Sequence, residues 1–183
     1  MVSTDADLSD SILPGNPEDL MKSGKFNKDL EVIIGSTESE GLLQVLTLWL
    51  KWTKTLSNFD IEGPQLLFGV PNADAVTPAD SEKVQKVLDF YNISADGSPT
   101  QGIEMFTDGS FAYGNYKTLN YLRKYGVKTY HYILTHQGQH SFSQIFGVDP
   151  IGVMHADDLI YLFKPTFSGD RSVSCKSVLS AAL

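Results

Sequence analysis

The sequence has little that would connect it to nucleic acid, to a membrane or to a disulfide framework. Its one cysteine, Cys175, rules out a disulfide within the chain and leaves the redox compartment open. Lys and Arg number 14 against 22 Asp and Glu, a net charge of −8, and no basic cluster occurs, which argues against nucleic acid and anionic membrane surfaces as partners. No apolar run approaches the roughly 18 residues that span a bilayer. Small neutral or cationic ligands suit this charge balance better.

Targeting signals are also scarce. The first ten residues are polar and acidic, without the basic start and apolar run of a signal peptide. Asn92-Ile93-Ser94 is a glycosylation acceptor pattern that has meaning only if the chain enters the secretory pathway. Chance occurrence is the better interpretation of this tripeptide.

The chain is long enough to bury a core. At 183 residues and 42% hydrophobic, it suits one ordinary domain or a piece of a larger one. We find no internal repeat and no low-complexity tract, so we expect residues 1–183 to form one continuous unit.

Two segments are typical of β-strands. Residues 30–35 form a short, β-branched apolar run that ends in Gly35, which predicts a strand buried on both faces of a parallel sheet. Residues 127–135 are rich in β-branched and aromatic side chains and predict a second strand, reached across helices rather than through a tight hairpin.

Four segments are typical of helices. A short helix is predicted to start at residues 17–21, with Pro17 near its first turn. An apolar pattern that includes Trp49 and Trp52 predicts another helix soon after Gly41, with both tryptophans in the core. Residues 81–91 predict a helix capped by Ser81, and residues 115–125 predict one that Gly126 ends. Strands separated by helices indicate an α/β architecture.

Glu40 and His155 are the candidate acid and base, because each follows a predicted strand on the side of the sheet where α/β enzymes place their catalytic groups. Composition alone gives Glu40 a helix-capping role at least as readily as a catalytic one. His155 stands beside Ala156, which leaves a ring accessible, and before two carboxylates that begin a helical turn.

A metal site and an aromatic pocket are weaker alternatives. His131, His136 and His140 are near in sequence, but the first two should lie on opposite faces of a strand, and no HExxH or CxxC occurs, so we expect no metal. Four aromatic residues can line a pocket or fill a core, and the core is their commoner position. They are Phe106, Phe111, Tyr113 and Tyr116.

The residues around both candidates resemble a known family. Residues 34–41 (IGSTESEG) are similar to the segment that carries the triad acid in type-B carboxylesterases and cholinesterases. Residues 152–163 (GVMHADDLIYLF) are similar to the segment that carries their triad histidine, closest to that of arthropod-type esterases, including juvenile-hormone-esterase-like enzymes. Residues 106–108 and 127–132 resemble two landmarks between them, and residues 12–14 and 17–20 the stretch before the acid. The separation of 155 − 40 = 115 residues also agrees with the family.

The resemblance implies a partial α/β-hydrolase fold in which Glu40 is the triad acid and His155 the base. In that family a serine on a G-x-S-x-G elbow precedes both, but this sequence contains no such motif and only 39 residues precede Glu40. We therefore expect a portion of an esterase domain, truncated at both ends, that is inactive alone. The implied ligand is a small carboxylic ester, with no cofactor, and the implied location of the full-length protein is secreted or in the endoplasmic reticulum.

Two other interpretations remain open. The same fold serves in non-catalytic cholinesterase-like adhesion proteins, so the chain could belong to a binding module, although retention of both Glu40 and His155 counts against that. A decayed, non-functional fragment is the third possibility.

Overall fold

A computed structural model describes residues 13–47, 59–94 and 99–163 of the chain. The chain divides into two compact units. The described residues up to Gly35 form the first unit together with Tyr113–Tyr132, and the remaining described residues form the second. In the described residues, no helix is long and apolar enough to cross a membrane.

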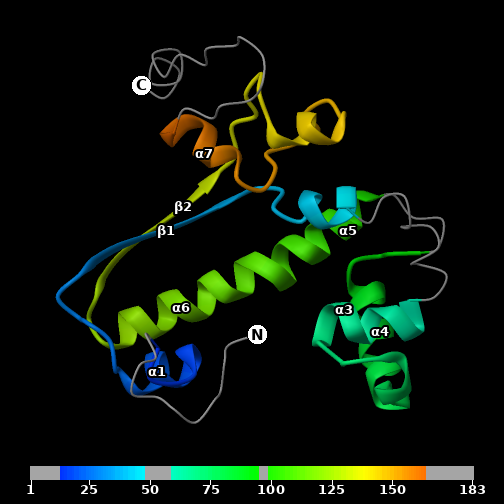
Figure 1. Cartoon of the computed structure of the whole chain (residues 1–183), viewed down its shortest axis with the longest axis horizontal. Coiled ribbons are helices and arrows are strands. Elements are labelled where there is room, and N and C mark those ends of the chain that lie inside the picture. The colour runs from blue at the N-terminus through cyan, green and yellow to red at the C-terminus, as the bar shows by residue number, and fades with distance from the viewer. Residues whose placement is uncertain (1–12, 48–58, 95–98, 164–183) are drawn as a thin grey trace. The chain divides into compact units, whose positions relative to one another are not determined.

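The two predicted strands are confirmed and pair with each other. β1 (Glu31–Thr37) and β2 (Lys128–Leu134) lie side by side in a two-stranded sheet (Figure 1). Lys128 Nζ donates to Glu31 Oε1 at the start of the pair, and the Glu38 N–H donates to the Leu134 carbonyl at its end, so the strands run parallel.

The expectation that the first strand would be buried on both faces is wrong. Ile33 is 70% exposed, and Tyr130 on the neighbouring strand is 47% exposed. A strand in a two-stranded sheet has one neighbour, and no element in the described part of the chain covers these side chains. Only the end of β1 is buried, at Ser36 and Thr37, where the chain enters the loop that carries Glu40.

The first unit also contains α1 (Pro17–Ser23) and α6 (Tyr113–Lys124), and both predicted helices are confirmed. Asn16 caps α1 by accepting from the Glu18 N–H, and Pro17 occupies its first turn. Gly126 follows α6 with a φ of 75°, a conformation that glycine adopts without strain.

Glu18 connects α1 to α6. Its carboxylate accepts from Lys117 and Tyr121 on α6 and from Lys22 one turn along α1. The hydrogen bond from Lys117, followed by those from Lys22 and Tyr121, lowers the pKa of Glu18 to about 2.

The second unit holds the remaining helical segments around one apolar cluster. In chain order these are α3 (Phe59–Phe68), η2 (Ala73–Ala75), α4 (Pro78–Phe90), α5 (Pro99–Thr107), the π-helical η3 (Asp108–Ala112), η4 (Phe142–Phe146) and α7 (Asp157–Leu162). The cluster is formed by Val45, Val84, Ile93, Met105 and Phe106, with Leu67 and Val87 among the residues packed against it.

The predicted helix over residues 81–91 is present as α4, but the cap at Ser81 is wrong. Thr77 caps the helix four residues earlier, because its hydroxyl accepts from the Asp80 N–H while the Asp80 carboxylate accepts from the Thr77 N–H. Pro78 then occupies the first turn.

The helix predicted after Gly41 is confirmed over residues 42–47, where Leu42 and Val45 are completely buried. Trp49 and Trp52 lie outside the described residues, so their expected core positions stay predictions.

Candidate active site

Glu40 lies in the tight turn that joins β1 to the helix at residues 42–47. The residue is 5% exposed, and its Oε1 accepts from the Thr37 N–H at 2.7 Å. Its second oxygen, Oε2, faces His155. The carboxylate is thus directed back toward the end of the strand and away from the first N–H groups of the helix, so the helix-capping alternative is wrong.

Gly41 holds the Glu40 turn against α5. Its N–H donates to Thr107 Oγ1 at 2.9 Å, and the same hydroxyl donates to the Ile103 carbonyl. A Cβ atom at Gly41 would collide with the Ile103 carbonyl oxygen and lie 2.7 Å from the Thr107 nitrogen. Only glycine lets the turn come this close to α5.

His155 lies in the loop before α7, and this loop runs beside the Glu40 turn. Ser39 and Met154 form a parallel bridge, and the Ser39 N–H donates to the Val153 carbonyl at 3.0 Å. Gly152 has a φ of 132° and Ala156 a φ of 69°, and the two positive dihedrals turn the chain on either side of the histidine. The parallel alignment of the strands therefore continues into the two loops and places residues next to Glu40 and His155 side by side.

The structure brings Glu40 and His155 together across 115 residues of sequence. The distance from His155 Nδ1 to Glu40 Oε2 is 2.6 Å. A carboxylate can only accept in this contact, so a neutral His155 ring that donates to Glu40 must do so through a proton on Nδ1, which leaves Nε2 as its basic nitrogen. The Glu40 side chain is 7% exposed and the His155 side chain 40%, which leaves one edge of the ring accessible. A buried carboxylate in contact with a partly exposed imidazole is the arrangement of the acid and the base in a catalytic triad.

Phe111 packs beside the histidine. Its ring centroid lies 5.0 Å from that of His155, with the planes inclined by 43°. Of the four aromatic residues considered as pocket or core, Phe106 is 2% exposed and belongs to the core. Tyr113 and Tyr116 are 59% and 67% exposed, so they do not fill the core.

Asp157 is a buried acid that the sequence interpretation did not single out. In the sequence it is one of two carboxylates in the first turn of a helix, a position usually open to solvent. In the structure Asp157 is only 4% exposed. Burial raises the pKa of its carboxyl, and this effect outweighs the hydrogen bonds from the Phe142 N–H, the Ser141 side chain and the Met154 N–H, which lower the pKa.

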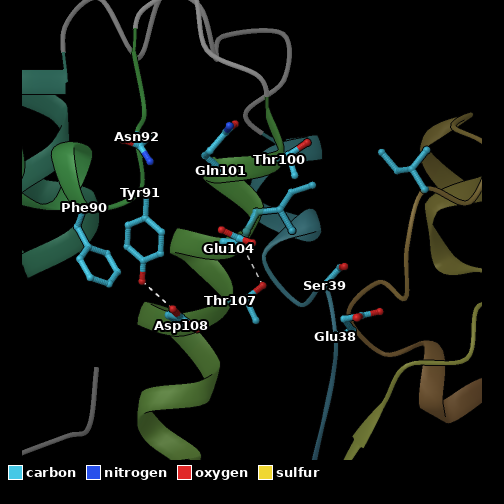
Figure 2. A pocket seen from close by; sticks show the side chains of 12 residues that line it. Glu38, Ser39, Phe90, Tyr91, Asn92, Thr100, Gln101, Glu104, Thr107 and Asp108 are labelled. Carbon is cyan, nitrogen blue, oxygen red and sulfur yellow. Dashed lines mark hydrogen bonds between the residues drawn. The ribbon is translucent and has the colours of Figure 1, made fainter.

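A separate pocket of about 890 Å³ lies beside the Glu40 turn (Figure 2). Glu38 and Ser39 approach it from one side, while Tyr91 on the other side donates to Asp108 Oδ2 at 2.7 Å. Burial and the Asp108 hydrogen bond raise the pKa of the Tyr91 phenol to about 12. Neither Glu40 nor His155 lines this pocket, so it is distinct from the pair.

The three other histidines do not form a comparable site. His131 is exposed on β2, while His136 follows the strand rather than lying in it, so the expected opposite-face placement of these two is wrong. Among the described residues, no group of three or more His, Cys, Asp or Glu side chains is arranged to hold a metal ion.

Comparison with known proteins gives the family. The model of the carboxylesterase family matches residues 2–179, nearly the whole chain. The chain belongs to this family. The family match accords with the resemblance seen around Glu40 and His155, and the architecture is a partial α/β-hydrolase fold, with parallel strands and flanking helices.

Two juvenile hormone esterases are similar to this family member. The juvenile hormone esterase of Tribolium castaneum is 31% identical in an alignment 167 residues long, which covers 81% of this chain and 28% of that protein. The crystal structure of juvenile hormone esterase from Manduca sexta, with OTFP covalently attached, has a TM-score of 0.65 at 23% identity and covers 86% of this chain and 29% of that one. The chain thus spans less than a third of the length of either relative.

Proposed function

We propose that this chain supplies the acid, Glu40, and the base, His155, of a serine carboxylic-ester hydrolase whose nucleophilic serine lies on other polypeptide sequence. The 2.6 Å contact between His155 Nδ1 and Glu40 Oε2 carries the proposal. Membership of the carboxylesterase family supports a small carboxylic ester as the substrate.

The proposed reaction uses the two nitrogens of His155 differently. Nε2 takes the proton of the serine hydroxyl as the serine oxygen attacks the ester carbonyl carbon, and returns that proton to the alcohol oxygen as the carbon–oxygen bond breaks. Water then resolves the acyl-enzyme through the same two proton transfers. Glu40 keeps the proton on Nδ1 and stabilises the positive charge that the ring carries between the transfers.

We assign the serine nucleophile and the oxyanion donors of this reaction to other polypeptide sequence. The sequence contains no G-x-S-x-G motif to supply the serine. Loss of a triad nucleophile costs about 10⁶ in kcat, and loss of an oxyanion donor roughly another 10²–10³. We therefore expect no ester hydrolysis above background from residues 1–183 alone.

A graft tests the proposal. Residues 1–183 replace the matching region of the Tribolium castaneum juvenile hormone esterase, and hydrolysis of p-nitrophenyl acetate is measured. The grafted protein should hydrolyse the ester, and His155→Ala should lower kcat by about 10⁶-fold to a residual rate still above the uncatalysed reaction. A matched variant at an exposed histidine, His136→Ala, should leave the rate unchanged. Full activity in the His155→Ala graft, or a folded graft with no activity, would reject the proposal and favour a binding module.

We also propose that the full-length protein is secreted or resides in the endoplasmic reticulum, because it belongs to the same family as the two juvenile hormone esterases. An antibody against residues 13–47 should detect the protein in culture medium or in a microsomal fraction. Detection in the cytosol alone would contradict this location.

A further inference from the structure

The buried carboxylate of Asp157 belongs to a polar cluster next to residues 147–156, the loop that carries His155 and is called the histidine loop below. Asp157 is the first residue of α7, yet it is 4% exposed. Ser141 and Ser143, which are 4% and 0% exposed, lie in the same cluster. A buried charged group destabilises a fold unless hydrogen bonds compensate for the lost water, so its partners indicate what it does.

Both oxygens of Asp157 accept from backbone N–H groups of two separate segments. Oδ1 accepts from the Phe142 N–H at 2.8 Å, at the start of η4. Oδ2 accepts from the Met154 N–H, also at 2.8 Å, in the histidine loop. The Ser141 side chain bonds the same carboxylate and also accepts from the Ser143 N–H, which ties the cluster to η4. One carboxylate therefore joins η4 to the residue immediately before His155.

Met154 is the residue through which this connection reaches the pair. Its N–H is held by Asp157, and its backbone forms the parallel bridge with Ser39, the neighbour of Glu40. The Met154 side chain is 1% exposed, so the segment is also fixed by packing. The Asp157 N–H in turn donates to the Met154 carbonyl at 3.0 Å, closing a tight turn around His155.

We infer that Asp157 is a positioning residue for His155: it fixes the backbone of Met154 between η4 and the Glu40 turn, so that the imidazole meets the Glu40 carboxylate. The role in catalysis rests on the proposed ester hydrolysis, whereas the role in placing the ring does not. An amide in place of the carboxylate offers one acceptor oxygen where two N–H groups point, so Asp157→Asn leaves one of them without a partner.

The inference is tested first on the ring itself, by proton NMR of this chain with ¹⁵N-labelled histidine. The resonance of the proton on Nδ1 of His155 is assigned by its loss in His155→Ala. It should be seen in the wild type and in the control Asp149→Asn, a change at an exposed carboxylate of the same loop. It should be lost to solvent exchange in Asp157→Asn. A folded Asp157→Asn variant that keeps this resonance unchanged overturns the inference.

If Asp157→Asn fails to fold, Ser141→Ala decides, because it removes one bond to the carboxylate and leaves both backbone bonds in place. Faster exchange of the Nδ1 proton in folded Ser141→Ala supports the inference, and an unchanged rate contradicts it. In the esterase graft, Asp157→Asn should lower kcat per titrated serine by about 10²-fold, the usual effect of a displaced catalytic group, with KM little changed. A graft without any hydrolysis rejects the proposed function, whereas the NMR result still stands.

Discussion

Gly41→Ala should weaken the second unit and displace the Glu40 turn. The added methyl group would collide with the Ile103 carbonyl oxygen and the Thr107 nitrogen, both backbone atoms of α5 that cannot move independently of the helix. The turn must therefore retreat from α5, which also breaks the 2.9 Å hydrogen bond from the Gly41 N–H to Thr107 Oγ1.

The size of the effect follows from these two losses. Overpacking at a closely packed position costs about 1–3 kcal/mol, and a lost hydrogen bond about 0.5–1.5 kcal/mol. Together they reduce the free energy of unfolding by roughly 2–4 kcal/mol, which in a chain of this size lowers Tm by roughly 5–15 °C.

Urea and thermal unfolding, followed by far-UV circular dichroism, measure the loss. The matched control is Gly114→Ala in α6, where an added Cβ meets nothing within 4 Å and alanine should stabilise the helix by about 0.4–1 kcal/mol. If Gly41→Ala unfolds at the same temperature and urea concentration as Gly114→Ala, the close approach of the turn to α5 is not present in solution.

Two further predictions concern the first unit. The pKa of Glu18 is lowered from 4.5 to about 2, so the stability that its ionised carboxylate contributes should be present above pH 4.5 and lost as the pH falls toward 2. The difference in unfolding free energy between wild type and Glu18→Gln, measured at low salt, should therefore disappear over this range. A difference that does not depend on pH would contradict the assigned contacts. Ile33 is 70% exposed on β1, so the isolated chain should associate as its concentration rises, and Ile33→Lys should reduce that association in sedimentation velocity experiments, whereas identical profiles would show that this side chain takes no part.

The strands and amphipathic helices could be predicted because their signals are local. Residues 30–35 and 127–135 are β-branched runs between helices, and α6 has an apolar periodicity that ends at a glycine. The exposure of Ile33 could not be predicted, since the same run in a wider sheet would be covered.

Two of the longer helices, α3 and α5, were not predicted because their sequences argue against helix formation. α3 contains Pro64 in its interior, where proline removes a backbone donor, and α5 contains Gly102. Both form because packing overrides local propensity: Pro64 is fully buried, and Met105 and Phe106 of α5 join the core of the second unit.

The Glu40 and His155 contact depended on the resemblance to carboxylesterases. No local pattern relates two residues 115 positions apart, and the pairing arises only from parallel strands and the Ser39–Met154 bridge. Asp157 had no signal of its own, because an acidic residue in the first turn of a helix usually faces solvent, and only the fold of the histidine loop turns it inward.

The most direct test of whether Glu40 and His155 act as one unit is the kcat of the double variant Glu40→Gln/His155→Ala in the esterase graft. Once His155 is removed, Glu40 has no ring to orient, so the double variant should be no slower than His155→Ala alone. Glu40→Gln alone should lower kcat by about 10²–10⁴-fold. The control Glu38→Gln, at an exposed neighbour, should leave kcat almost unchanged. Losses that multiply in the double variant, or a Glu40→Gln variant as active as Glu38→Gln, would contradict the account.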